Sequence, residues 1–249
     1  MNSLLTVQKL SKNFGALRAS DGIDFDVAEG ETHAVIGPNG AGKTTFISQL
    51  AGNLLPDAGR IAFAGEDITR LPAARRARRG LARSFQITSV YLEFTALQNV
   101  ALAVQAHSGH SFRFWRDARN DAALLDPARQ VLKDVGIEEA KFDMLAANLA
   151  HGEQRQLEVA MALATRPRLL LLDEPMAGMG TEESQRMIGL LGSLKRKQTI
   201  VLVEHDMDAV FRLADRISVL VYGRLIATDT PERIRANEEV RRAYLGEDL

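Results

Sequence analysis

The 249-residue sequence is long enough for one large domain, or two small ones, to bury a core without disulfides or metals. Its 46% hydrophobic and 25% charged residues exclude a chain that is disordered throughout. The 31 basic and 32 acidic residues give a net charge of −1, which offers no overall attraction for nucleic acid or anionic lipid. The absence of cysteine excludes disulfide scaffolds, thiol nucleophiles and cysteine-ligated metals.

The sequence shows no pattern for membrane insertion or export. No stretch approaches the roughly 18 consecutive apolar residues that a membrane-spanning helix needs. Residues 1–15 also lack a basic segment followed by an apolar stretch of about 7–15 residues, which is the pattern of a secretory signal peptide. We therefore expect a soluble intracellular protein.

The N-terminal part of the chain predicts strands that lead into a glycine-rich loop. Leu4–Leu10 alternates in part between apolar and polar residues, Ile23–Val27 alternates cleanly, and His33–Ile36 is a short apolar run. A helical stretch begins at Lys43, and Arg60–Ala64 is a further β-like segment. The glycine-rich loop therefore lies between a strand and a helix.

This loop matches the pattern G-x-x-x-x-G-K-[S/T] of a phosphate-binding loop. Its glycines let backbone N–H groups turn toward phosphate oxygens, Lys43 reaches the β- and γ-phosphates, and the Thr44 hydroxyl ligates Mg²⁺. The alternative is a glycine-rich turn without a ligand, which the flanking strand and helix disfavour. The residues predicted to bind phosphate are Gly37, Pro38, Asn39, Gly40, Ala41, Gly42, Lys43 and Thr44.

A run of arginines follows and raises a nucleic-acid hypothesis. Its members are Arg75, Arg76, Arg78, Arg79 and Arg83. No aromatic residues are interleaved with them and the net charge is −1, so we interpret the run as a solvated helix face and expect no nucleic-acid partner. Between about residues 90 and 165 the pattern changes to helix periodicity without a convincing strand.

Strands alternate with helices in the C-terminal part. The leucines of Leu169–Asp173 are typical of a strand buried on both faces. We expect Asp173 to hold Mg²⁺ through water and Glu174 to orient or deprotonate an attacking water; the alternative is a solvated acidic turn. The remaining expected elements are a helix over 181–197, a strand over 199–203, a helix over 207–214 and strands over 217–222 and 224–228. This alternation predicts an α/β layered fold interrupted by a helical insertion.

The order of these motifs resembles the ATP-binding cassette of ABC transporters over essentially the whole chain. The matching segments are Gly37–Thr45, Gln86, Leu149–Gln154, Asp173–Pro175 and His205. Residues 149–154, LAHGEQ, are similar to the family's LSGGQ signature. The resemblance implies an α/β fold over residues 1–249 as a single P-loop NTPase domain. That domain would have a RecA-like core, an antiparallel β subdomain and an α-helical signature subdomain inserted at approximately 88–165.

The resemblance also implies an ATP hydrolase that uses ATP and Mg²⁺. Glu174 and His205 would be catalytic, with His205 at the γ-phosphate, and Gln86 would touch Mg²⁺ or its water. Phe14 offers a flat π face for adenine. No lysine follows an asparagine, so the Asn-Lys-x-Asp reader of guanine is absent and ATP is favoured over GTP. Further binding residues would be Thr45 and, opening a helix toward the γ-phosphate of a facing subunit, Gly152, Glu153 and Gln154.

Within the family, several segments look like the ATPase subunits of branched-chain amino acid importers. They are Gly80–Gln86, residues 149–164 and the tail Arg242–Glu247. Residues 110–121, which contain Trp115, fit an extra piece of the helical subdomain; local packing is the alternative. An importer ATPase for urea, amides or other small solutes fits the same segments, and so does a single-cassette exporter ATPase of the lipopolysaccharide type.

Two positions depart from the family pattern. Ala150 replaces the signature serine, and Gly180 stands where Asp or Asn is common. Two sites built from this chain alone would be imperfectly coupled, and cassettes of this subfamily resemble one half of a heterodimer, so we expect a non-identical second cassette as partner. The resemblance also implies two transmembrane permease subunits and, indirectly, a periplasmic or extracellular solute-binding protein. The expected location is cytoplasmic, on the inner face of the plasma membrane. His107 and His110 lack a third ligand in view and are interpreted as a solvated loop.

Overall fold

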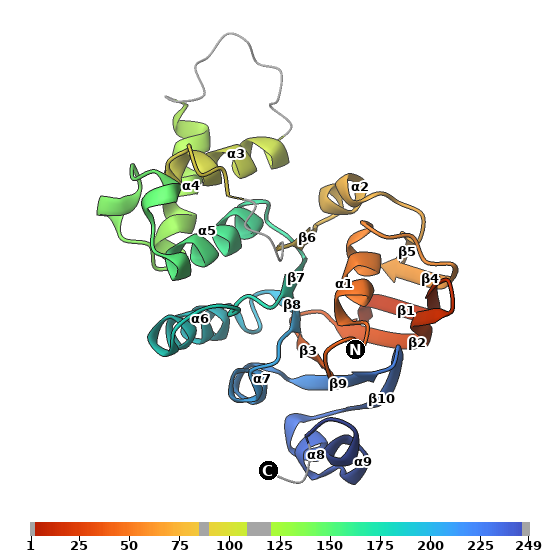
Figure 1. Ribbon diagram of the computed structural model, residues 1–249. Helices are drawn as coiled ribbons and strands as arrows, with labels where there is room; N and C mark the ends of the chain where they lie inside the picture. The colour runs from red at the N-terminus through yellow and green to blue at the C-terminus, as the bar shows by residue number, and fades with distance from the viewer. Residues whose placement is uncertain (1–2, 85–89, 109–120, 246–249) are drawn as a thin grey trace.

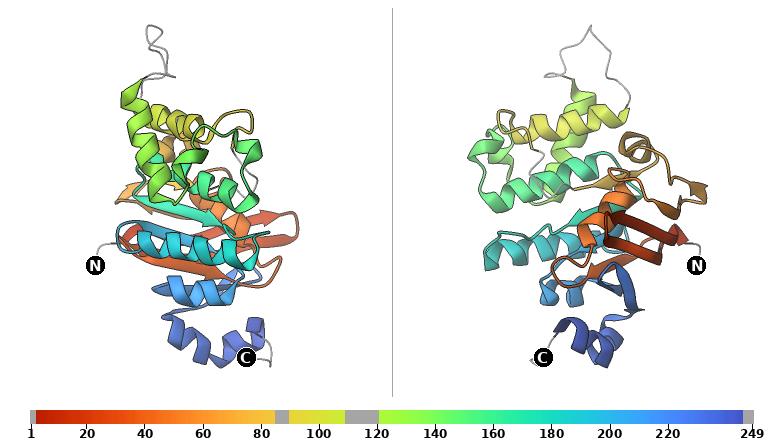
Figure 2. Two further views of the ribbon diagram at one scale, coloured as in Figure 1. Left: turned by 90° about the vertical axis from the view of Figure 1, so that its left-hand side faces the viewer. Right: turned by 45° about the vertical axis from the view of Figure 1, so that its right-hand side comes forward.

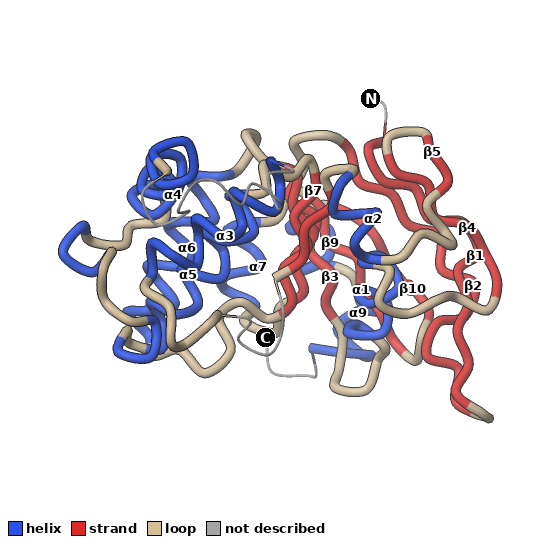
Figure 3. Tube along the Cα trace, turned by 90° about the horizontal axis from the view of Figure 1, so that it is seen from above, coloured by secondary structure: helices blue, strands red, loops and turns tan. Residues whose placement is uncertain are grey.

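The structure, a computed structural model, describes residues 3–84, 90–108 and 121–245. These residues form two β-sheets and several helices (Figure 1). In Figure 3 most helices gather on one face of the larger sheet, and the smaller, antiparallel sheet lies on its other side. Within the described ranges, no helix combines the length and the apolar character needed to cross a membrane.

The smaller sheet has the strand order β2-β1-β4-β5, and every neighbouring pair is antiparallel. Its strands are β1 (Ser3–Phe14), β2 (Leu17–Ala28), β4 (Ala58–Phe63) and β5 (Glu66–Asp67). The alternating apolar residues of β1 and β2 are buried on one face, as a half-buried sheet requires. β1 continues four residues past the predicted end at Leu10, because Lys12–Phe14 still pair with β2.

The larger sheet has the order β10-β9-β3-β8-β7-β6. Its strands are β3 (Thr32–Ile36), β6 (Leu81–Arg83), β7 (Leu169–Asp173), β8 (Thr199–Val203), β9 (Arg216–Val221) and β10 (Arg224–Asp229). The pairs are parallel except for β10, which lies antiparallel to β9 at one edge. Every residue of β3, β7 and β8 is buried, because protein covers both faces of the sheet.

The period of two along β7 divides its leucines between two cores. Leu170 and Leu172 pack in the core that contains α5 (His151–Ala164) and α6 (Thr181–Leu194). Leu169 and Leu171 pack on the other face, in the core that contains α1 (Lys43–Ala51) and the antiparallel sheet. The phosphate-loop helix and the signature helix therefore lie on opposite faces of the larger sheet.

The remaining helices lie at the two ends of the molecule or against the larger sheet (Figure 2). They are α2 (Ala73–Arg78), α3 (Ala96–Ser108), α4 (Ala122–Asp134), α7 (Met207–Leu213), α8 (Pro231–Ala236) and α9 (Glu238–Val240), with a final π-helical turn at Arg241–Leu245. Helices α3, α4 and α5 pack on one another as the helical insertion that the sequence predicts. The helix predicted over 181–197 ends at Leu194, because Lys195 adopts an extended backbone and forms a β-bridge with Gln198.

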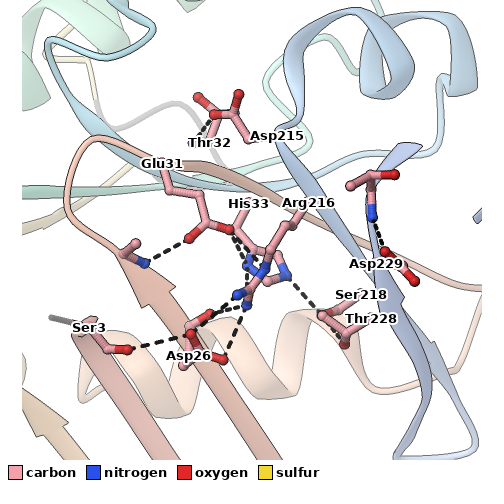
Figure 4. A network of polar contacts seen from close by, with 12 residues as sticks. Ser3, Asp26, Glu31, Thr32, His33, Asp215, Arg216, Ser218, Thr228 and Asp229 are labelled. Carbon is pink, nitrogen blue, oxygen red and sulfur yellow. Dashed lines mark hydrogen bonds and ion pairs between the residues drawn. The ribbon is translucent and has the colours of Figure 1, made fainter. Parts of the chain in front are cut away.

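A polar network, in which Glu31, His33 and Ser218 are buried, joins β2, β3, β9 and β10 near the start of β3 (Figure 4). His33 has no exposed surface; its Nδ1 lies 3.1 Å from the Glu31 carboxylate and its Nε2 lies 2.8 Å from the Ser218 hydroxyl. Arg216 pairs with Glu31 and with Asp26, each at 3.1 Å. Burial lowers the pKa of His33, and Glu31 opposes this shift. The network therefore holds a neutral imidazole where the two sheets meet.

Candidate functional site

The phosphate loop connects β3 to α1, and its path requires glycine at two positions. A Cβ on Gly37 would lie 2.0 Å from the Leu220 carbonyl oxygen, and a Cβ on Gly42 would lie 2.2 Å from the Ala19 carbonyl oxygen. Gly42 also has a φ of 104°, which other residues rarely adopt. Of the predicted loop residues, Asn39, Gly40 and Thr44 are exposed, Pro38, Gly42 and Thr45 are half-buried, and Gly37, Ala41 and Lys43 are buried.

Lys43 lies at the first turn of α1 with its ammonium group turned into the loop. Its Nζ donates to the carbonyl oxygens of Gly37 at 2.7 Å and Pro38 at 3.1 Å. Burial lowers the pKa of Lys43, while the charges of Glu174 and Asp173 raise it. The loop carbonyls thus hold a cation beside the free N–H groups of a helix N-terminus, an arrangement that suits phosphate oxygens.

The two predicted acidic residues follow one another at the end of β7. Asp173 is 1% exposed; burial raises its pKa, which the guanidinium of Arg83, 2.9 Å from Oδ2, opposes. Its second oxygen, Oδ1, is buried without a hydrogen-bond partner. Glu174 is half-buried and has a φ of 50°, and its N–H donates to the Val203 carbonyl oxygen at 2.9 Å. The chain therefore turns sharply at the Glu174 carboxylate, in a backbone conformation that is strained for this residue.

Glu204, a residue that no sequence motif predicted, connects this turn to His205. The Glu204 side chain has no exposed surface and accepts the N–H groups of Met176 and His205, each at 3.0 Å. Burial raises the pKa of Glu204, and these hydrogen bonds oppose the shift. His205 is 61% exposed, with Nδ1 3.7 Å from the Glu204 carboxylate. An acidic residue directly after a buried strand was the one sequence signal for this contact.

Phe14 ends β1 at the hairpin turn, where the side chain is half exposed. The Lys12 ammonium lies 5.7 Å from the centre of the Phe14 ring, and the Asp57 carboxylate holds that ammonium at 2.7 Å. An exposed aromatic ring on a supported hairpin suits stacking on a planar base.

The signature residues are already engaged within their own chain. Glu153 accepts the N–H of Ala150 at 3.1 Å and pairs with Lys141 at 2.5 Å. The Gln154 side chain donates to the carbonyl oxygens of Ala146 and Leu149 at 3.0 and 3.3 Å. These contacts fix the start of α5, and therefore the position of the positive end of its helix dipole.

A carboxylate from α6 also meets this end of α5. Glu183 accepts the N–H of Gly152 at 3.3 Å and the N–H of Gly180 at 3.2 Å. A Cβ on Gly152 would lie 2.8 Å from the Glu183 carboxylate. Glu183 therefore ties the signature to the loop before α6, whereas no hydrogen bond or ion pair among the described residues joins Gly152 to Lys43.

The arginine run is not a uniform solvated helix face, and that interpretation was wrong for two residues. Arg76 has no exposed surface; its guanidinium donates to the carbonyl oxygens of Gln49 and Leu50, each at 2.7 Å, and of Thr69 and Leu71, each at 2.9 Å. Burial lowers the pKa of Arg76 to about 10. Arg83 pairs with Asp173, as described above. The other members of the run, Arg75, Arg78 and Arg79, are exposed.

Some predicted residues lie outside the described ranges. Gln86 falls in 85–89, His110 and Trp115 fall in 109–120, and the end of the tail falls in 246–249. His107 is exposed on α3. Among the residues described, no three His, Asp or Glu side chains converge as a metal cluster.

Sequence comparisons connect the chain to proteins of ATP-driven transport. The family described as ABC transporter matches residues 20–177, and the family described as branched-chain amino acid ATP-binding cassette transporter matches residues 224–249. The high-affinity branched-chain amino acid transport ATP-binding protein BraF of Pseudomonas aeruginosa is 39% identical, and LivG of Escherichia coli K12 is 38% identical. Each match covers 98% of both chains. The lipopolysaccharide export system ATP-binding protein LptB of Haemophilus influenzae is 30% identical over 99% of both chains.

Solved structures confirm the predicted fold class. A crystallised cassette of an ABC transporter in an ADP conformation superposes with a TM-score of 0.87 at 27% identity. A nucleotide-free cassette superposes with a TM-score of 0.85, also at 27% identity. Both matches cover 99% of this chain and 100% of the other.

Proposed function

The chain belongs to the ABC transporter family and is an ATPase of that family, and we propose that it energises the import of branched-chain amino acids. The observation that carries this substrate class is the match of residues 224–249 to the family described as branched-chain amino acid ATP-binding cassette transporter. The full-length likeness to BraF and LivG supports the same substrates. The likeness to LptB is lower, at 30%, so an exporter is the weaker alternative.

In this proposal the hydrolytic site is complete only between two cassettes. The phosphate loop and Asp173–Glu174 of one chain face Gly152–Gln154 of the other, whose helix N-terminus stabilises the γ-phosphate. The opposite placement of α1 and α5 about the larger sheet supports this arrangement. Because Ala150 and Gly180 lack side chains that would couple two such sites, the second cassette is non-identical.

The residues present fit Mg²⁺-ATP. Nucleotide-bound Mg²⁺ takes one or two carboxylates and leaves its other positions to phosphates and water, and the buried Oδ1 of Asp173 lacks a partner. Thr44, Asp173 and Gln86 would hold the ion. When bound, Mg²⁺ neutralises charge on the β- and γ-phosphates.

Each side chain of the site then has its own role in ATP binding and hydrolysis. Phe14 stacks on adenine, and Lys43 binds the β- and γ-phosphates in place of the loop carbonyls it now contacts. Glu174 accepts a proton from the attacking water, and its turned backbone fixes where the carboxylate points. His205 donates to the γ-phosphate. The Glu204 carboxylate accepts the N–H groups of both His205 and Met176, and so holds the His205 backbone beside the segment that follows Glu174.

A groove between α2, α3 and α5 supports a contact with the permease subunits. It has a volume of about 400 Å³ and is lined mainly by small and apolar side chains, including Ala77, Leu81, Ala103 and Met161. Ser84 and Arg83 also line it, close in sequence to Gln86. A cytoplasmic segment of a permease in this groove would connect transport to the site, with the chain on the inner face of the membrane.

Reconstitution tests the proposed function. The chain, its second cassette and two permease subunits are placed in liposomes, and ATP hydrolysis is measured with solute-binding protein loaded with leucine, urea or an amide. We expect several-fold stimulation with leucine and none in Lys43→Ala. Stimulation only by urea or by an amide would show that the chain serves that solute and not branched-chain amino acids. Stimulation by lipopolysaccharide without a binding protein would contradict the proposal that the chain drives import.

A further inference from the structure

The Asp173 carboxylate, one of the proposed Mg²⁺ ligands, is paired with a cation of its own chain. Arg83 lies on β6, which runs parallel to β7 and places Arg83 beside Leu171. Its guanidinium donates to Asp173 Oδ2 at 2.9 Å. The Arg83 side chain is 11% exposed and the Asp173 side chain is 0% exposed, so water screens this ion pair very little.

The same guanidinium reaches the phosphate-loop helix. Its other terminal nitrogen donates to the hydroxyl of Ser48 on α1 at 3.2 Å. Arg83 thus connects the strand that carries Asp173 to the helix that begins at Lys43. These are the elements that would hold the metal and the phosphates.

The ion pair between Arg83 and Asp173 leaves one polar atom of each side chain without a hydrogen bond. Asp173 Oδ1 and Arg83 Nε are both buried without a hydrogen-bond partner. A purely structural ion pair would gain by satisfying these atoms, because a buried unsatisfied polar atom is unfavourable. Here the guanidinium occupies one carboxylate oxygen and leaves the other free.

We propose that Arg83 is a positioning residue that replaces the divalent cation at Asp173 whenever no Mg²⁺-nucleotide is bound. It compensates the buried carboxylate through Oδ2 and holds Oδ1 ready for the metal or its water. When Mg²⁺-ATP binds, the metal takes over this compensation and the role of Arg83 diminishes. The inference rests on the proposed role of Asp173 in holding Mg²⁺.

Thermal unfolding tests this proposal without measuring catalysis. Arg83→Met, Arg83→Lys and the matched control Arg79→Met, an exposed arginine of the same run, are each melted in EDTA and with saturating Mg²⁺-ATP. We expect Arg83→Met to melt roughly 5–15 °C below wild type in EDTA, as for a buried charge that has lost its partner. With Mg²⁺-ATP the difference in melting temperature between Arg83→Met and wild type decreases by at least about half, because the metal compensates the charge of Asp173. Arg83→Lys recovers part of the loss in EDTA, and Arg79→Met follows wild type in both conditions.

An equal loss in EDTA and in Mg²⁺-ATP would overturn the proposal, because a merely structural ion pair gives that result. If Arg83→Met does not fold, the double variant Arg83→Met/Asp173→Asn, which removes both charges, is compared with it. Recovery of folding supports charge compensation as the role of Arg83, and failure of the double variant to fold contradicts it. If Mg²⁺ adds nothing to the stabilisation of wild type by ATP, the metal site and this inference both fall.

Discussion

Individual side chains of the candidate site differ in how far the protein prepares them for a ligand. Lys43 is fixed by two carbonyl oxygens of its own loop. Phe14 is half exposed on a hairpin, so its contribution depends on the ligand itself. We therefore expect substitutions at Phe14 to change nucleotide affinity and little else.

Phe14→Ala should weaken ATP binding by about 1–3 kcal/mol, the range for stacking of a base on an aromatic side chain. Titration calorimetry with Mg²⁺-ATP measures the change. Leu17→Ala is the matched control, because Leu17 pairs with Phe14 in the same hairpin, is 65% exposed and has no π face. Equal affinity in both variants and in wild type would place the adenine elsewhere.

At the scale of an element, Arg76 joins the end of α1 to the segment before α2. It caps carbonyl oxygens of Gln49 and Leu50 in the last turn of α1 and contacts two more carbonyls at residues 69 and 71. The helix that carries Lys43 is thus stabilised at its far end by a buried cation. The pKa of Arg76 is lowered to about 10, which leaves the side chain charged at neutral pH.

Arg76→Met should destabilise the fold by at least about 3 kcal/mol, because several buried carbonyl oxygens lose their donor. For a chain of this size we expect the melting temperature to fall by roughly 6–12 °C in calorimetry. Arg75→Met, one residue away and exposed, should stay within about 0.5 kcal/mol of wild type. If Arg76→Met and Arg75→Met have the same melting temperature, the hydrogen bonds from Arg76 to the end of α1 contribute no stability.

The network around His33 predicts a loss of stability in acid. Its pKa is lowered in the folded chain from the ordinary value of 6.5, so below about pH 6.5 the unfolded chain binds a proton that the folded chain does not. The stabilising effect is complete above that pH and is lost as the pH falls. The charged groups that face the imidazole are Asp26, Glu31 and Arg216.

Urea unfolding at pH 7.5 and 5.5 measures this effect. From pH 7.5 to 5.5 the free energy of unfolding should fall by on the order of 1 kcal/mol more in wild type than in His33→Gln. Glutamine keeps hydrogen-bonding groups but does not titrate. The comparison removes the contributions of the other titrating residues, which both proteins share. The same pH dependence in both proteins would exclude His33 as the titrating group.

Strands with an uninterrupted apolar run were predictable from the sequence, and the shortest strands were not. The runs of leucine and valine in β7 and β8 allowed one interpretation, and the predicted spans are those observed. β5 and β6 hold two and three residues, too few for a period to appear. The six-residue helix α2 carries Arg75, Arg76 and Arg78, for which the arginine run had predicted a helix. The end of α6 at Leu194 depends on a bridge between Lys195 and Gln198, which no propensity predicts.

At the scale of the whole molecule, the order of motifs along the chain predicted the cassette, but the pairs that support the site are distant in sequence. Arg83 and Asp173 are 90 residues apart, and Glu204 reaches Met176 across 28 residues. No local pattern indicates the partner of Arg83, and the one signal for Glu204 is its place directly after a buried strand; both contacts depend on which strands become neighbours in the larger sheet. The arginine run shows the same limit, since composition alone does not separate the buried Arg76 from the exposed Arg75.

Two cassettes enclose ATP in the proposed mechanism, and Glu174 activates the water. The fold places the phosphate loop and the signature on opposite faces of the larger sheet, so one chain alone does not bring them together. A variant that keeps the shape of Glu174 but removes its negative charge therefore separates binding from hydrolysis.

Glu174→Gln in the complete complex, compared with the exposed Glu182→Gln as control, is the sharpest test of this mechanism. The measurement is the amount and chemical state of radiolabelled nucleotide that stays with the complex after gel filtration. We expect Glu174→Gln to retain uncleaved ATP and to hydrolyse it about 10²–10⁴-fold more slowly, while Glu182→Gln behaves as wild type. A Glu174→Gln complex that cleaves ATP at the wild-type rate, or that does not bind ATP, would contradict the mechanism.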